Sequence, residues 1–170
     1  ALAQQLPQRK SEFVWFGAFA PVFALLTLFN APSPSPMKSA DRTICVAIAV
    51  IVRDGRILIC QRPANTTLGG LWEFPGGKQQ EGETLEQCLI REVREELNIE
   101  IAPEQPLVVI EHTYPHGRVR LHPYLCRPVH GEPRPLEVQA WQWVAPAELA
   151  NYPFPPANDT LLADLARLSF

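Results

Sequence analysis

Three glutamates in one short stretch of the chain have the spacing of a metal site. Glu92, Glu95 and Glu96 follow Arg91 within GKQQEGETLEQCLIREVREELNI, which covers residues 77–99. Positions i, i+3 and i+4 are neighbours on a helix surface, so a helix here gathers the three carboxylates on one face. Like charges so placed repel by roughly 0.2–0.5 kcal/mol per pair, and a hard cation such as Mg²⁺ removes that repulsion. A solvated acidic face is the alternative for such a run taken alone.

The same stretch carries the signals of a helix. Thr84, with Gln87 three residues later, has the pattern of a capping box. Apolar residues follow at helical spacing, namely Leu85, Leu89, Val93 and Leu97. We therefore predict a helix with one apolar face that packs and one acidic face that binds.

A glycine turn lies directly before this helix. Residues 71–78 read LWEFPGGK, in which Pro75 is followed by Gly76 and Gly77. Two glycines let the backbone bend tightly and approach a ligand closely, so the Gly76 carbonyl is a candidate metal ligand. A double glycine alone is usually only a turn. Followed at fixed spacing by Glu83 and the acidic run, it is a specific pattern.

Together these residues resemble the Nudix box. The family pattern is Gly, five residues, Glu, seven residues, Arg-Glu, an aliphatic residue, any residue, Glu-Glu, any residue, Gly and an aliphatic residue. The matching positions are Gly77, Glu83, Arg91, Glu92, Val93, Glu95, Glu96 and Ile99. Asn98 replaces the last glycine, where a helix C-cap also tolerates Asn in a left-handed conformation. The resemblance implies an α/β fold, the Nudix α-β-α sandwich with a mixed sheet.

Beyond the box, the resemblance narrows to the MutT-like branch over about residues 42–170. It is carried by the segments QRP at 61–63, LWEFPGGK at 71–78 and FPPAN at 154–158. In that branch the last segment closes over the base and its Asn reads the purine edge, a role we transfer to Asn158. An amide offers a donor and an acceptor, which suits a keto purine such as 8-oxoguanine. The alternative is that Asn158 only caps the terminal helix.

The resemblance implies further contacts around the substrate. Arg62 would face the phosphate or sugar, while Phe74 and Tyr114 would flank the base. Thr67 and Gly117 stand where close relatives can place His and Arg. The expected substrate-binding residues are Arg62, Thr67, Glu73, Phe74, Pro75, Gly76, Tyr114 and Asn158. The expected metal ligands are Gly76, Glu92, Glu95, Glu96 and Glu137, and the expected catalytic residues are Arg91, Glu92, Glu95 and Glu96.

The implied activity is hydrolysis of a nucleoside triphosphate to monophosphate and pyrophosphate, with 8-oxo-dGTP as the expected substrate and mutation avoidance as the role. Mg²⁺, or Mn²⁺ in its place, would be the cofactor. Glu92 is a candidate to take the proton of the attacking water, and Arg91 is expected to orient Glu83 or another carboxylate. A pyrimidine relative acting on CTP or methylated CTP would share this chemistry. A non-catalytic module that binds oxidised guanine in DNA would lack the box carboxylates, which are present here.

The amino-acid composition of the chain limits the kinds of binding partner that we expect. The chain has 170 residues, 46% of them hydrophobic, which suits one core, and its net charge of −3 shows no basic excess for a polynucleotide. The cysteines lie far apart without a CxxC pair, which favours reduced thiols over a zinc site or disulfides. We expect a cytoplasmic enzyme acting on small nucleotides, with a monomer favoured.

The first 36 residues differ in character from the rest. An uncharged apolar run over residues 13–29 follows Arg9 and Lys10. In the next segment, residues 31–36, every second residue is a proline. The apolar run is at the short edge for a membrane span, so a signal or an anchor is one interpretation. The other is sequence upstream of a Nudix domain over residues 37–170, beginning at Met37, the only methionine. We favour the second and expect no stable membrane association.

The remaining pattern predicts strands and a final helix. A run rich in β-branched residues over 44–52 leads through a hairpin turn at 53–56 into a second strand over residues 57–60. Residues 107–110, 119–126 and 141–144 read as further strands, and residues 161–168 read as a terminal helix. The whole is a mixed sheet flanked by helices.

Overall fold

A computed structural model describes residues 43–115 and 117–168 of the chain. The expectations attached to residues 1–36 lie outside the described residues. Within the described part, none of the helices has the length and apolar character needed to cross a membrane.

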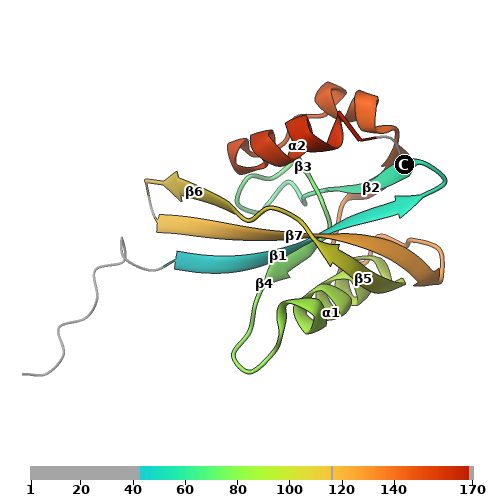
Figure 1. The fold of residues 1–170 in the computed structure, drawn as a ribbon, viewed down its shortest axis with the longest axis horizontal. Coiled ribbons are helices and arrows are strands. Elements are labelled where there is room, and N and C mark those ends of the chain that lie inside the picture. Colours follow the sequence, from blue (N-terminus) through green and yellow to red (C-terminus); the bar gives the residue numbers. More distant parts are fainter. Residues whose placement is uncertain (1–42, 116, 169–170) are drawn as a thin grey trace, which may run out of the picture. The chain divides into compact units, whose positions relative to one another are not determined.

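A mixed β-sheet forms the middle layer of the fold (Figure 1). Its strands are β1 Thr43–Arg53, β2 Arg56–Gln61, β3 Trp72–Glu73, β4 Gly76–Lys78, β5 Glu100–Pro106, β6 Ile110–Tyr114, β7 Gly117–His130 and β8 Ala140–Val144. The strand order is β3-β2-β1-β7-β5, with β4 on β1, β6 on β7 and β8 on β2. Strands β1 and β7 run parallel, and the other pairs are antiparallel.

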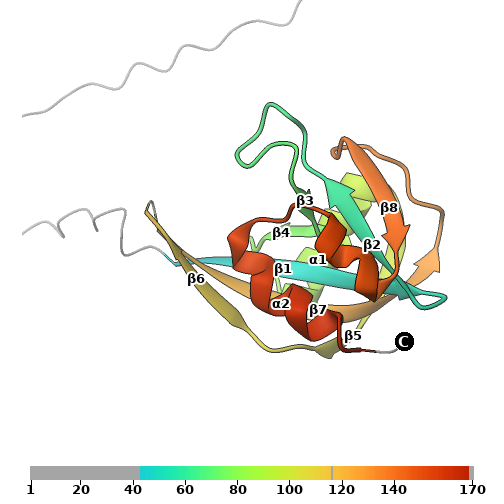
Figure 2. The same cartoon turned by 90° about the horizontal axis from the view of Figure 1, so that it is seen from above.

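Helices cover both faces of this sheet (Figures 1 and 2). Helix α1 is Leu85–Leu97 and helix α2 is Asp159–Leu165, with 3-10 helices over Pro146–Asn151 and Pro156–Asn158 before α2. The predicted α/β sandwich with a mixed sheet is confirmed.

Strand β1 contributes side chains to two separate hydrophobic cores, because its successive side chains point to opposite faces of the sheet. Ala47, Ala49 and Ile51 are buried on the α1 side, and Ile48 and Val50 on the α2 side. The partners from α1 are Cys88, Leu89, Val93 and Leu97, and those from α2 are Leu161 and Leu165. Burial on both faces explains why the strand reads as a continuous apolar run.

Helix α1 has the ends that its sequence predicts. The hydroxyl of Thr84 accepts the backbone N–H of Gln87 at 3.2 Å, and the Gln87 side chain accepts the N–H of Thr84 at 2.8 Å. At the other end Asn98 has φ 55 and donates its N–H to Arg94 O at 2.9 Å. Local capping therefore fixes which face of α1 presents the glutamates.

The structure corrects the prediction of a strand over residues 107–110. Residues 107–109 lie between β5 and β6, which pair with different parts of β7, and Ile110 begins β6. Val108 and Val109 are exposed. Strand β5 was not predicted, because it contains Pro103 and Pro106. The strand tolerates these prolines at the edge of the sheet, where its register with β7 shifts after Pro103. The terminal helix is also shorter than predicted, ending at Leu165.

Candidate active site

Arg91 is the centre of a partly buried carboxylate network formed by α1 and the segment before it. Its Nε and Nη2 donate to the two oxygens of Glu83 at 3.1 and 2.7 Å. Its Nη1 donates to Glu92 at 2.8 Å and to Glu95 at 3.1 Å. The hydrogen bonds from Arg91, and next the backbone N–H of Gln80, lower the pKa of Glu83 to about 2. One guanidinium thus orients three carboxylates.

Glu96 lies on the inner side of the same helix turn, in a different environment. Its Oε2 accepts the backbone N–H of Gly76 at 3.1 Å, and among residues 43–115 and 117–168 no cation pairs with it. Burial, followed by the nearby charge of Glu73, raises the pKa of Glu96 to about 8; Glu92 and Glu137 act in the same direction, and the hydrogen bond from Gly76 opposes them. A cation bound beside Glu96 would therefore stabilise its ionised form, which the protein itself disfavours.

The two glycines of the turn make room for this arrangement. Gly76 has φ +143, and a side chain there would overlap the carbonyl of Ala47 on the neighbouring strand. A side chain on Gly77 would overlap the carboxyl group of Glu92. The turn can therefore bring backbone against both β1 and α1 only because neither residue carries a Cβ.

The donor set fits a hard divalent cation. Carboxylate oxygens are the preferred ligands of Mg²⁺, and an uncompensated buried carboxylate gains most from such a charge. In the part of the chain that the structure describes, no three acidic, His or Cys side chains are already arranged as ligands. In this structure Arg91 engages Glu92 and Glu95, while Gly76 engages Glu96 through its N–H. The predicted Gly76 carbonyl and exposed Glu137 ligands stay predictions.

A cavity of about 560 Å³ opens beside these carboxylates. Its walls come from β1, the segment 62–68, β3 and β4, the hairpin of β6 and β7, and residues 155–158. The predicted residues that line it are Arg62, Thr67, Glu73, Phe74, Gly76, Tyr114 and Asn158. Pro75 is not among the lining residues; it is buried, and its carbonyl accepts the N–H of Ala49 at 2.8 Å.

Arg62 contacts two other segments of the cavity wall. Its Nη1 forms an ion pair with Glu73, and its Nε donates to the carbonyl of Thr67 at 2.9 Å. Burial raises the pKa of Glu73, and the opposite charge of Arg62 limits that rise. Arg62 thus carries a positive charge into the cavity while holding the segment that follows it.

Asn158 supplies a buried amide to the cavity wall. It is 6% exposed, and its Nδ2 donates to Pro155 O at 3.4 Å. It precedes α2 but makes no side-chain capping bond, so the alternative that it only caps this helix is wrong. Among the described residues nothing donates to its Oδ1. A buried amide with unused hydrogen-bonding capacity is suited to a ligand edge.

The two aromatic residues expected at the base lie on the cavity in different ways. Phe74 is almost fully buried and packs against Phe154, with ring centroids 5.2 Å apart. Tyr114 is half-buried, with the ring of His112 at 4.4 Å. Tyr114 therefore has more ring surface to offer a ligand than Phe74 does.

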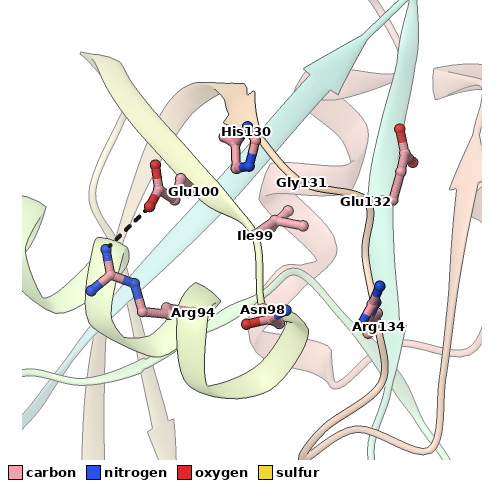
Figure 3. A pocket seen from close by; sticks show the side chains of 8 residues that line it. All are labelled: Arg94, Asn98, Ile99, Glu100, His130, Gly131, Glu132 and Arg134. Atoms are coloured by element: carbon pink, nitrogen blue, oxygen red, sulfur yellow. Dashed lines mark ion pairs between the residues drawn. The ribbon is translucent and has the colours of Figure 1, made fainter.

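A second hollow, of about 310 Å³, lies at the C-terminal end of α1 (Figure 3). It is lined by Arg94, Asn98, Ile99, Glu100, His130, Gly131, Glu132 and Arg134, and shares no lining residue with the larger cavity. Arg94 faces Glu100 at 3.8 Å, and Glu132 pairs with Arg53 at 2.9 Å. None of the predicted site residues lies here.

Sequence reasoning missed part of the cavity wall. Ile44, Val46 and Ile48 line it from β1, and their alternate spacing in a predicted strand could have found them. Leu68 and Lys78 also line it. No periodic pattern in the sequence predicts that Leu68 faces a cavity.

Comparison with known proteins fits this geometry. The chain belongs to the Nudix family, since the NUDIX domain matches residues 46–164. It is 40% identical over 121 residues to the CTP pyrophosphohydrolase of Escherichia coli, covering 71% of this chain and 90% of that protein. It is 38% identical over 126 residues to a putative 8-oxo-dGTP diphosphatase 2 of Mycobacterium tuberculosis, with coverages of 72% and 87%. For the 8-oxo-dGTP diphosphatase of Escherichia coli the identity is 34% over 124 residues, with coverages of 72% and 96%.

Solved structures agree. The solution structure of the E. coli ORF135 protein matches with a TM-score of 0.65 and 39% identity, covering 75% of this chain and 91% of that one. A MutT Nudix hydrolase from Burkholderia pseudomallei matches with a TM-score of 0.66 and 32% identity, with coverages of 72% and 97%. The protein is a Nudix hydrolase of the MutT type, a class that uses divalent metal ions.

Proposed function

We propose that this protein hydrolyses nucleoside triphosphates to monophosphate and pyrophosphate, with 8-oxo-dGTP as its preferred substrate. One observation carries the proposal: the cavity is lined both by the buried amide of Asn158 and by Gly76, whose backbone N–H binds the carboxylate of Glu96. The carboxylate calls for a cation and the amide for a polar ring edge. A purine nucleotide with its metal ion supplies both.

The carboxylates of α1 and Arg91 have different proposed roles in this reaction. Glu92, Glu95 and Glu96 would hold the divalent cation, which when bound screens the phosphate oxygens and lowers the pKa of the attacking water. Glu92 is the proposed general base, because Arg91 engages its Oε1 and leaves Oε2 open to accept the proton. The water oxygen bonds to phosphorus as the phosphorus to bridging-oxygen bond breaks, which releases pyrophosphate. Arg91 itself orients carboxylates through charge-assisted hydrogen bonds.

The preference for 8-oxo-dGTP rests on the amide of Asn158. A keto purine presents both hydrogen-bond donors and acceptors on its edge, and an amide can pair with each kind. CTP or a methylated CTP is the second candidate, because the relative at 40% identity is named a CTP pyrophosphohydrolase. The metal chemistry is common to both, so only the base contacts separate them.

A release assay separates the two candidates. Pyrophosphate release is measured with Mg²⁺ on 8-oxo-dGTP, dGTP, CTP, 5-methyl-CTP and dCTP. We expect kcat/KM for 8-oxo-dGTP to exceed that for CTP by about tenfold or more, as a site built to pair with a polar edge discriminates strongly. A higher kcat/KM for CTP would reassign the substrate and leave the chemistry standing.

We also infer that the cofactor is Mg²⁺, with Mn²⁺ able to replace it, and that the enzyme acts as a monomer on free nucleotides in the cytoplasm. The oxygen donors suit both ions. Chelation with EDTA should abolish pyrophosphate release, and either ion should restore it. Light scattering on the eluting protein should give the mass of one chain, and a dimer mass would contradict the monomer.

A further inference from the structure

Leu68 has a backbone conformation that is unfavourable for leucine. Its φ is 59, in the left-handed region, where Cβ crowds the following carbonyl. The other described non-glycine residues with positive φ are Asp54 and Asn98, and both types tolerate this region through local hydrogen bonds. If the turn geometry alone mattered, glycine would serve better at position 68, as it does at Gly70 with φ 80.

The surrounding loop keeps Leu68 in this conformation. Its base is closed by two backbone hydrogen bonds, from Arg62 N–H to Leu71 O at 2.9 Å and from Gly70 N–H to Arg62 O at 3.1 Å. Within it, the N–H of Leu71 donates to the carbonyl of Leu68 at 3.3 Å, and the Arg62 side chain holds the carbonyl of Thr67. Strain of this kind persists only where neighbouring bonds over-determine the backbone, and it clusters at ligand sites.

The Leu68 side chain does not stabilise the protein's interior. It is 42% exposed and belongs to neither of the two hydrophobic cores of the described residues. It lines the same cavity as Arg62, Thr67 and Asn158. A large apolar group is therefore presented, at a conformational cost, to the contents of the cavity.

We propose that Leu68 is a substrate-contact residue that packs against the nucleoside part of the bound nucleotide. This inference rests on the proposed function, because it takes the substrate to be a nucleoside triphosphate. Only the base and sugar of such a substrate have apolar surface, while the triphosphate belongs with the metal ion and the carboxylates. Covering the nucleoside removes apolar area from water and shields the hydrogen bonds of Asn158.

Two substitutions separate this role from a structural one. Leu68→Gly removes the side chain and the strain together, so its melting temperature should be no lower than that of the wild type. Its KM for the better substrate of 8-oxo-dGTP and CTP should nevertheless rise about fivefold, with kcat within about twofold, as expected for lost ground-state contacts. Leu68→Ala should show the same rise in KM. Leu68→Met restores apolar reach and should return KM to within about twofold of the wild type.

Two controls isolate the nucleoside contact. Inorganic triphosphate has no nucleoside, so its inhibition constant should be the same for the wild type and Leu68→Gly. Asp54→Gly makes the same kind of backbone change at φ 50 in the β1–β2 turn and should leave KM unchanged. An unchanged KM in Leu68→Gly and Leu68→Ala would overturn the proposal, as would an inhibition constant for inorganic triphosphate that rises in parallel with KM.

The outcomes also distinguish this proposal from the proposed function. If the wild type prefers CTP, the assignment of 8-oxo-dGTP fails, and the Leu68 comparison is decided on CTP. If the variants bind the better nucleotide as the wild type does, the Leu68 contact fails and nucleotide hydrolysis stands. If the wild type neither hydrolyses nor binds either nucleotide, both proposals fall.

Discussion

The two hollows of this protein differ in how their polar groups are satisfied. In the smaller one, Arg94 faces Glu100 and Glu132 pairs with Arg53, so each of these charges has a partner. Beside the larger one, the partly buried Glu96 has no cation partner among the described residues, and no described group donates to the amide oxygen of Asn158 in the cavity wall. Polar groups with unused bonding capacity beside a cavity mark a place that a ligand can complete.

The largest effect is expected from removing the uncompensated charge. Glu96→Gln keeps the shape of the side chain and deletes its charge, so kcat should fall by about a hundredfold or more, as losses of key electrostatic groups do. The fold should survive, because the substitution removes a partly buried carboxylate that neighbouring carboxylates repel. Steady-state pyrophosphate release with Mg²⁺ measures the change, and circular dichroism checks the fold.

Glu100→Gln is the matched control from the smaller hollow. It makes the same chemical change at an exposed residue whose ion pair with Arg94 is long, at 3.8 Å. Such a pair contributes little, so kcat should stay within about twofold of the wild type. Comparable losses in Glu96→Gln and Glu100→Gln would erase the distinction between the two hollows.

A smaller, base-dependent effect is expected at Asn158. A buried amide paired with a base edge contributes about 1–3 kcal/mol when its loss leaves the partner unsatisfied. Asn158→Ala should therefore lower kcat/KM for 8-oxo-dGTP by about ten- to a hundredfold, while dCTP, which gains little from this residue, is hydrolysed at nearly its original rate. Equal losses for the two nucleotides would mean that Asn158 supports the segment around it and does not read the base.

The carboxylate face of the site was predictable because its determinants are local. The Thr84 capping box sets where α1 begins, and the apolar stripe sets which side packs. The positions of Glu92 and Glu96 then follow from helical geometry alone. The pairing of Arg91 with Glu83 is likewise contained within one short segment.

The cavity was less predictable because distant parts of the chain build it. Its wall joins β1 residues such as Val46 to Asn158 near the end of the described chain, and no sequence period connects them. Strand β5 was hidden by its prolines, which only its edge position permits. The left-handed conformation of Leu68 depends on hydrogen bonds between residues flanking the loop, so its type alone gave no warning.

The smallest effect is expected from removing the residues before Met37. The change in character at Met37 predicts that residues 37–170 fold and work alone. A chain beginning at Met37 should keep kcat/KM for 8-oxo-dGTP within about twofold of the full chain, because no expected site residue precedes it. Loss of activity or of solubility in the shortened chain would refute this, and recovery of the full chain in the membrane fraction would favour the anchor interpretation.

Thermal unfolding with and without magnesium tests the central claim most directly, because it asks for a cation at the carboxylate face without requiring substrate. A carboxyl whose pKa is raised in the folded protein costs stability as the pH rises, and the cost is complete above about pH 8 for Glu96. At about pH 9, millimolar Mg²⁺ should raise the melting temperature of the wild type and of Glu100→Gln by binding the folded state. Glu96→Gln should respond much less. An equal rise in all three proteins, or none in the wild type, would contradict a metal site built on Glu96.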